Sequence, residues 1–118
     1  MAYFSVDDQF HSHPKAKRAG LAALGLWTLA GSWCRAYKSD GFVPAWWVQE
    51  RRGQRHADAL VAAGLWHPCS EGGEPGYRFH DWHDVHDASD ETERQRELGR
   101  ERQRKRRAKL REQLGASL

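Results

Sequence analysis

The chain has few cysteines and no long apolar run. Cys34 and Cys69 are the only cysteines among 118 residues, which excludes the dense disulfide framework of small secreted domains. We expect both thiols to be reduced, in buried or half-buried positions. No apolar run reaches the roughly 18 residues that span a bilayer, and no charged-then-apolar leader follows Met1. These absences predict a cytoplasmic protein.

Large apolar side chains become scarce after residue 90, where only Leu98, Leu110, Leu114 and Leu118 are found. All six tryptophans lie before residue 83. Four scattered leucines do not form a packed core. We therefore predict a folded domain over residues 1–87 and a basic, partly helical or disordered arm over residues 88–118.

Charge divides at nearly the same place. From residue 90 onward there are ten Lys or Arg and six acids, a net charge of +4, whereas the first 89 residues hold nine bases and ten acids, a net charge of −1. A nearly neutral head on a basic arm favours an anionic polymer as partner over a small substrate.

Periodicity predicts the first elements of the head. Between Leu21 and Tyr37 apolar residues recur at spacings of three and four, which is typical of a helix, and their number indicates that the helix is central. Gly25 and Gly31 within it indicate that a neighbour approaches closely. Pro14 begins a shorter helix before it, and residues 3–6 alternate like an edge strand.

Residues 40–82 have the pattern of two helices followed by a hairpin. Pro44 begins a helix that ends at Gly53, which we expect in the left-handed conformation. The next helix runs from about Gln54 to Ala63 and stops at Gly64. A loop over residues 70–76 then joins two strands. The predicted fold class is mainly α with a small β hairpin: a winged helix-turn-helix plus a charged C-terminal helix or arm.

Candidate DNA-binding side chains cluster where the turn meets the second helix. A helix-turn-helix presents this region to the major groove, where Arg pairs with guanine and Gln with adenine. The predicted contacts in the head are Arg51, Arg52, Gln54, Arg55 and His56. The alternative is an ordinary solvated turn.

The hairpin and the arm differ in what they offer to DNA. The hairpin tip carries Glu71 and Glu74 and no base, so we expect little contact from it beyond Arg78 on the strand. The arm is expected to neutralise phosphates, and the alternative is a solvated spacer. Its predicted contacts are Arg104, Lys105, Arg106, Arg107, Lys109 and Arg111, preceded by Arg100 and Arg102.

Signals for metal binding or catalysis are weak. His80, His83 and His86 are three residues apart, a spacing that suits a zinc site on a helix. We interpret the segment instead as a strand end followed by a polar connector, and expect no metal. Asp7 and Asp8 are adjacent and so point apart, and Gly72-Gly73 is a hairpin turn without a phosphate-binding pattern. We expect no catalytic residue and no cofactor.

Trp46 and Trp47 are adjacent, so both cannot face the core. We expect one to pack inward. The other then lies beside the arginines, where it is available for stacking or for a protein partner.

Several segments together resemble the N-terminal winged-helix domains of DnaD-like and phage replisome-organiser replication proteins of actinobacteria and their phages. The resemblance covers about residues 3–85. It rests on Asp7-Asp8 with Phe10, His13-Pro14-Lys15, Leu24-Gly25-Leu26-Trp27, Ser32-Trp33-Cys34, Asp40-Gly41-Phe42-Val43-Pro44, Leu60-Val61-Ala62-Ala63-Gly64-Leu65-Trp66 and His80-Asp81-Trp82-His83. Such proteins usually continue into a further domain, whereas here a basic arm follows.

The resemblance implies binding of double-stranded DNA in replication initiation, without catalysis by this domain. We expect a DNA-binding protein of phage or prophage replication initiation or transcriptional control. The expected partners are double-stranded DNA and a replication or host protein. The alternative is a protein-interaction module that uses the acidic hairpin and an exposed Trp, with the arm as a tether.

Overall fold

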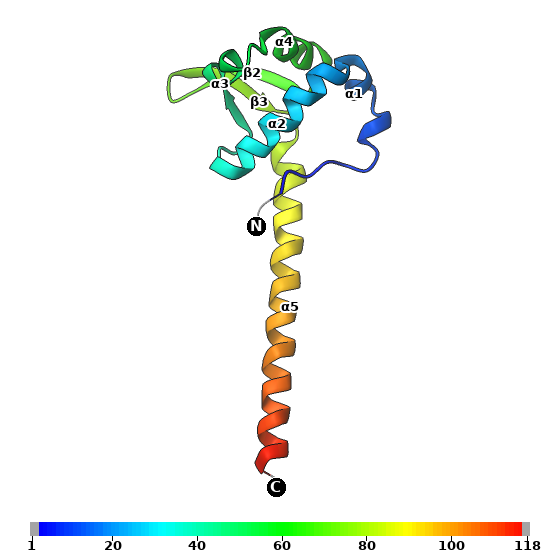
Figure 1. The fold of residues 1–118 in the computed structure, drawn as a ribbon, viewed down its shortest axis with the longest axis vertical. Coiled ribbons are helices and arrows are strands. Elements are labelled where there is room, and N and C mark those ends of the chain that lie inside the picture. Colours follow the sequence, from blue (N-terminus) through cyan, green and yellow to red (C-terminus); the bar gives the residue numbers. More distant parts are fainter. Residues whose placement is uncertain (1–2, 117–118) are drawn as a thin grey trace. The chain divides into compact units, whose positions relative to one another are not determined.

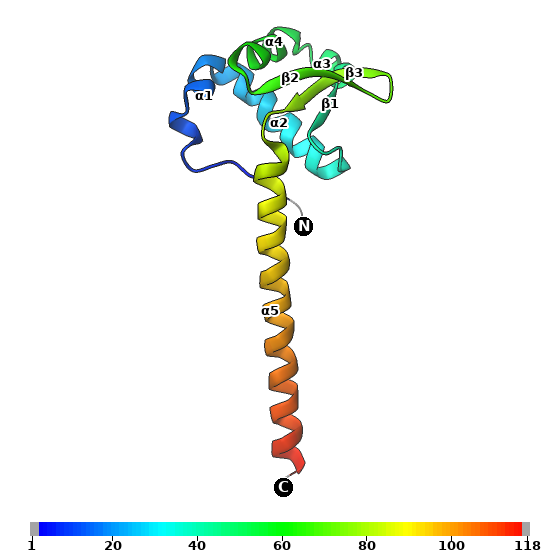
Figure 2. The same ribbon diagram turned by 180° about the vertical axis from the view of Figure 1, so that it is seen from behind.

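The computed structural model describes residues 3–116, without the side chains of residues 88–90, 92, 93 and 116. It is mainly helical, with one three-stranded antiparallel sheet and a long C-terminal helix (Figures 1 and 2). The chain divides into two compact units, Met1–His86 and Asp87–Leu118. The elements in order are the short 3-10 helix η1 (Phe10–Ser12), α1 (Pro14–Ala19), α2 (Leu21–Tyr37), β1 (Phe42–Pro44), α3 (Ala45–Glu50), α4 (Gln54–Ala63), β2 (Trp66–Glu71), β3 (Glu74–Phe79) and α5 (Trp82–Ala116).

Helix α2 lies at the centre of the first unit and has the predicted bounds. It buries a stripe that includes Leu26, Trp27 and Cys34. The number of apolar residues in this helix would suggest that little of its surface meets solvent, but Leu21 is 90% exposed and Leu29 is 60% exposed. Its apolar residues are too widely spread around the helix for one set of neighbours to cover them all.

The two interior glycines of α2 differ in their surroundings. A side chain at Gly31 would overlap the ring of Phe4, so this position confirms the predicted close approach. At Gly25 the same test finds open space, and the prediction is wrong there. The N-terminal segment that carries Phe4 is extended but forms no strand, which corrects the edge strand predicted for residues 3–6.

The sheet contains a strand that the sequence pattern does not reveal. β1 is only three residues long and pairs with β3, so the strand order is β1-β3-β2. Pro44 is the last residue of β1 and caps α3, whose helical residues begin at Ala45. At Gly76, opposite Pro44, an added Cβ would overlap the backbone oxygen of Val43, so glycine is required for the two strands to approach.

The turn between α3 and α4 uses a different residue from the one predicted. Gly53 has a φ of −96° and caps the start of α4, so it is not left-handed. Arg52 takes the left-handed conformation instead, with a φ of 53°. A Cβ at Gly53 would make a tight contact, 3.2 Å from a methyl group of Leu26. α4 ends before Gly64, as predicted, and Gly64 takes the left-handed conformation with a φ of 83°.

The hairpin and the start of α5 also differ from the prediction. β2 and β3 continue until only Gly72 and Gly73 separate them, both with positive φ, so the seven-residue loop expected at 70–76 is absent. Two left-handed residues suit the twist of a two-residue hairpin. β3 ends at Phe79, and Trp82 begins a helix where a strand end and a polar connector were predicted.

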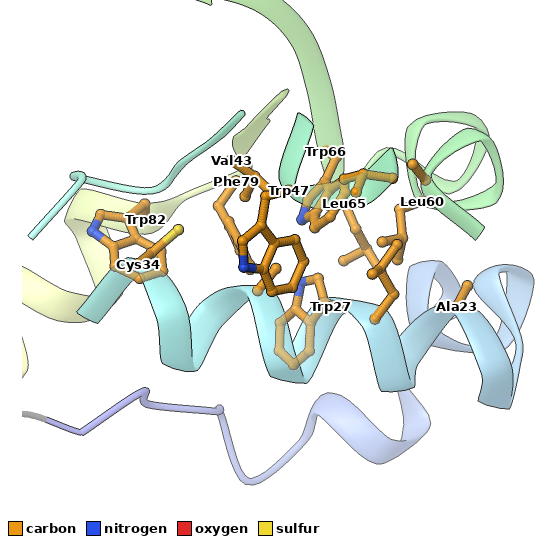
Figure 3. Packing of buried hydrophobic residues seen from close by; sticks show 14 residues of the cluster. Ala23, Trp27, Cys34, Val43, Trp47, Leu60, Leu65, Trp66, Phe79 and Trp82 are labelled. Atoms are coloured by element: carbon orange, nitrogen blue, oxygen red, sulfur yellow. The ribbon is translucent and has the colours of Figure 1, made fainter. Parts of the chain in front are cut away.

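The core of the first unit is largely aromatic. Trp27, Trp47, Trp66 and Trp82 are buried together with Phe79 (Figure 3). Trp47 is 2% exposed whereas Trp46 is 45% exposed, which confirms that only one member of this pair faces inward. The core therefore holds the helices and the sheet together and leaves one tryptophan at the surface.

The two free thiols have different environments, and we predict that they react at different rates. Cys34 is fully buried, and burial raises the pKa of its thiol to about 11 although Ser39 and Arg78 act in the opposite direction. Cys69 is half-buried. The thiolate is the reactive species. At pH 8 a shift from 9.0 to about 11 lowers the thiolate fraction about 100-fold.

Titration of the native protein with a thiol reagent at pH 8 is therefore expected to show one fast thiol, and a second that reacts only after denaturant is added. The variant Cys69→Ser is expected to lose the fast phase. Two equally fast thiols in the native protein would show that Cys34 is not enclosed as described.

Candidate nucleic-acid interface

Helix α4 has one buried and one exposed face. Ala57, Leu60 and Ala63 are buried in the core. Gln54, Arg55, Asp58 and Ala62 are exposed, and their spacing puts Gln54, Asp58 and Ala62 along one line of the helix, with Arg55 beside it. The predicted site residues Gln54 and Arg55 thus lie together at the N-terminal end of an outward face.

The side chain of Gln54 is held in place by two neighbours. Its Nε2 donates to Asp58 Oδ1 and to the hydroxyl of Tyr77 on β3, both at 2.9 Å. Sequence reasoning missed Asp58 and Tyr77 as part of this surface. The i, i+4 spacing of Gln54 and Asp58 was the available signal, whereas Tyr77 comes near only through the tertiary fold.

The arginines of the turn fall into two groups. The guanidinium of Arg51 lies 3.8 Å from the ring centroid of Trp47, and its Nη1 donates to the Trp47 carbonyl oxygen at 2.9 Å. Arg52 and Arg55 are exposed and form no ion pair or hydrogen bond within the described part of the chain. Arg52 and Arg55 are therefore free to bind an anion, whereas Arg51 is already engaged. His56, another predicted contact, follows Arg55 and is half-buried.

Arg78 is tied to the rest of the protein. Its Nη1 donates to the backbone oxygen of Asp40 at 3.0 Å, and its Nη2 lies 3.0 Å from Glu71 Oε2. The hairpin tip presents Glu71 and Glu74 to solvent. These carboxylates would repel phosphates. The guanidinium of Arg78, the predicted DNA contact on this strand, is already bonded to Asp40 and Glu71.

The N-terminal turn of α4 leaves backbone donors available. Its cap, Gly53, has no side chain that accepts from the first N–H groups. Such groups together with the helix dipole attract anions. Arg52 and Arg55 flank this turn, so charges and backbone donors are concentrated at one place on the surface.

The three histidines predicted not to bind metal lie in separate environments. His80 contacts His67, with 2.9 Å between their ring nitrogens, and lies 3.1 Å from Asp81 Oδ2. His86 is buried and stacks on Trp82. His83 is exposed on α5. Among the side chains that the structure describes, no group of three or more His, Cys, Asp or Glu is placed to hold a metal ion.

His86 joins the N-terminal segment to the start of α5. The backbone N–H of Ser5 donates to Nε2 at 3.1 Å, and Nδ1 lies 3.0 Å from the carbonyl oxygen of Trp82. An amide can only donate and a carbonyl can only accept, so these bonds require the neutral imidazole with its proton on Nδ1. His86 is thus a packing residue, and nothing in the pattern of three histidines indicated its burial.

A cavity of about 280 Å³ lies under the N-terminal segment, with Phe10, Lys15, Trp27 and His80 among its lining residues. Asp7 also lines it, and its Oδ1 accepts from the backbone N–H of Gln9 at 2.7 Å. This carboxylate therefore caps a turn.

The second unit is a solvated helix. All of its described side chains are exposed. Arg94 pairs with Glu91 at 3.4 Å. The bases from Arg100 to Arg111 form no ion pair or hydrogen bond with any residue that the structure describes. These include all six predicted arm contacts, which are therefore available to an external anion.

None of the helices in the described part of the chain is long and apolar enough to cross a membrane. Comparison of the chain with protein-family models, with curated proteins and with solved structures finds no match.

Proposed function

We propose that this chain is a duplex-DNA-binding protein of the winged helix-turn-helix class. In this proposal α3 and α4 are the helix pair, α4 enters the major groove and the β2–β3 hairpin is the wing. The order α2, β1, α3, α4, β2, β3 and the three-residue turn from Arg51 to Gly53 support it. So does the sheet, in which a short strand before the helix pair joins the hairpin.

The observation that carries the proposal is the surface around the start of α4. Two unpaired guanidinium groups, Arg52 and Arg55, flank an N-terminal turn whose backbone donors have no side-chain cap. Gln54 lies between them and is fixed by Asp58 and Tyr77. Arginines bind phosphates or guanine, and Gln54, whose two amide hydrogens are already donated, can offer its Oε1 to a donor on a base edge. The opposite face of α4 is packed in the core through Ala57, Leu60 and Ala63.

The biological role follows from the resemblance given under Sequence analysis. We propose a role in replication initiation or transcriptional control of a phage or prophage, by binding and without catalysis. The basic segment of α5 adds affinity that does not depend on sequence.

Replacing Arg55 with alanine tests the role of α4. A preferred site is first selected from random duplexes, and binding is measured by fluorescence anisotropy. We expect Arg55→Ala to weaken binding to that site by about 1–3 kcal/mol, with a smaller loss on unrelated duplexes, if Arg55 contacts a base.

The matched control is Lys38→Gln, which removes one positive charge from an exposed position after α2. We expect it to change affinity much less than Arg55→Ala. Equal losses for Arg55→Ala on every duplex would make Arg55 a phosphate contact. No loss on any duplex would contradict the proposed placement of α4.

A second candidate function rests on exposed aromatic side chains. Trp33 contacts both Tyr37 and Trp46, with ring centroids 5.2 Å and 6.1 Å apart. Tyr37 is 71% exposed and Trp46 is 45% exposed. Exposed aromatic clusters are typical of protein interfaces. In this alternative the cluster binds a phage or host protein, and Trp46→Ala abolishes that binding while DNA affinity is unchanged.

A further inference from the structure

The bases of α5 are arranged in two stripes on opposite sides of the helix. An α-helix turns about 100° per residue, so residues three or four apart lie on the same side. One stripe consists of Arg100, Arg104, Arg107 and Arg111, and the other consists of Arg102, Lys105, Arg106 and Lys109. The centres of the two stripes are about 180° apart by the same geometry.

The sides between the stripes carry no bases in this segment. Glu101 and Ala108 lie between the stripes on one side, and Gln103 and Leu110 lie between them on the other. All the side chains of residues 100–111 are exposed. The helix therefore presents positive charge in two opposite directions and has a neutral or acidic surface between them.

This arrangement restricts the shape of the partner. A flat anionic surface, such as a membrane, contacts one side of a helix and leaves the opposite stripe unused. Two opposite stripes are complementary to a partner that has negative charge on both sides of the helix. The two phosphate backbones that border a groove of double-stranded nucleic acid have this geometry.

We propose that residues 100–111 bind in the major groove of duplex DNA, with one stripe on the phosphates of each strand. This inference rests on the proposed function, because it takes duplex DNA as the partner. A helix with side chains is about 10–12 Å wide and the major groove of B-DNA is about 12 Å wide. The major groove of A-form RNA is deep and narrow, which excludes regular double-stranded RNA from the same binding mode.

Repulsion within each stripe couples binding to helix stability. Like charges four residues apart destabilise a helix, and each stripe contains two such pairs: Arg100/Arg104 and Arg107/Arg111 on one, and Arg102/Arg106 and Lys105/Lys109 on the other. Phosphates placed along both stripes relieve this repulsion. DNA binding is therefore expected to increase the circular dichroism signal of the helix at 222 nm.

The test keeps the charge and breaks the helix. Ala108 lies between the stripes, so Ala108→Pro in the full chain interrupts the helix while all eight bases remain. The matched control is Ala108→Gln. Binding to a 20-base-pair duplex, and to one of its single strands, is measured by fluorescence anisotropy over a series of salt concentrations.

We expect Ala108→Pro to bind the duplex at least about 10-fold more weakly than Ala108→Gln, with a shallower salt slope, because each lost phosphate contact removes about 0.9 from the slope. Binding to the flexible single strand should be unchanged. Equal duplex affinities for the two variants would overturn the groove proposal and leave an arm that acts by charge alone. Absence of duplex binding by the unmodified chain would instead contradict the proposed function.

Light scattering distinguishes binding in the groove of one duplex from bridging between two duplexes. We expect no large particles when duplex DNA is in excess over protein. Particles that disappear when all four bases of either stripe are replaced by Gln would show that the stripes bridge separate duplexes, and this result would also overturn the groove proposal.

Discussion

Replacing Trp66 with alanine is expected to lower the free energy of unfolding by about 3–5 kcal/mol. Trp66 is fully buried at the start of β2 and stacks on Tyr77, with 5.3 Å between the ring centroids. The ring of Phe79 meets it edge-on at a centroid distance of 5.6 Å. The indole thus joins β2 to β3 and to the helices beneath. Its removal leaves a cavity that these aromatic neighbours cannot fill without moving.

Trp66→Phe is the matched control in the same chemical-denaturation experiment. The indole Nε1 of Trp66 is buried and has no hydrogen-bond partner among the residues described, so its loss removes an unsatisfied donor. We expect Trp66→Phe to be destabilised by less than half as much as Trp66→Ala. Similar losses for both variants would contradict this account, in which most of the loss comes from the larger cavity left by alanine.

Deleting residues 90–118 is expected to have the largest effect on DNA affinity. The deletion removes eight unpaired bases between Arg100 and Arg111 but keeps every tryptophan and the contact between His86 and Ser5. If only four of the eight bases contact phosphates, the salt slope becomes shallower by about 3.6. The ratio of the DNA affinity of the full chain to that of the truncated chain then falls about 150-fold between 50 and 200 mM salt, by the same relation.

Two readouts accompany this deletion. Near-ultraviolet circular dichroism is expected to be unchanged, because the aromatic core belongs to the first unit. The order of preference among duplex sequences should also be retained, since phosphate contacts carry no sequence information. If the truncated chain keeps both the affinity and the salt slope of the full chain, the arm is a spacer and the protein-interaction alternative gains support.

Helices α2 and α4 were predictable because local signals and tertiary packing agree there. Both have an apolar stripe at helical spacing, and α4 ends at a glycine that takes a positive φ. The separation of Trp46 from Trp47 also followed from backbone geometry, because adjacent residues on a helix cannot share a buried face. In these cases the sequence carries the information within a few residues.

Other elements depend on contacts between distant residues. β1 has only three residues and exists because β3 pairs with it. Trp82, the first residue of α5, packs against Gly41, where a Cβ would lie 2.7 Å from the ring. Arg52 takes the left-handed conformation expected at Gly53, and Gly53 lies close to the distant side chain of Leu26. No local pattern contains these constraints.

The candidate site was likewise predictable only in part. The cluster of Arg51, Arg52, Gln54 and Arg55 is visible in the sequence, but the availability of each side chain is not. Arg51 is engaged by the ring and carbonyl of Trp47, and Arg78 by Asp40 and Glu71. These contacts arise from the fold, and they concentrate the free charge of the head site on Arg52 and Arg55.

Nuclear magnetic resonance of the ¹⁵N-labelled chain, titrated with duplex DNA, tests the central claim most directly. The account predicts that backbone amides of residues 52–58 shift on binding together with those of the basic segment of α5. The indole N–H resonance of Trp46, a residue that is 45% exposed, should not shift and serves as an internal control. Shifts at the Trp46 indole and at Tyr37, with none at residues 52–58, would contradict the proposed DNA interface.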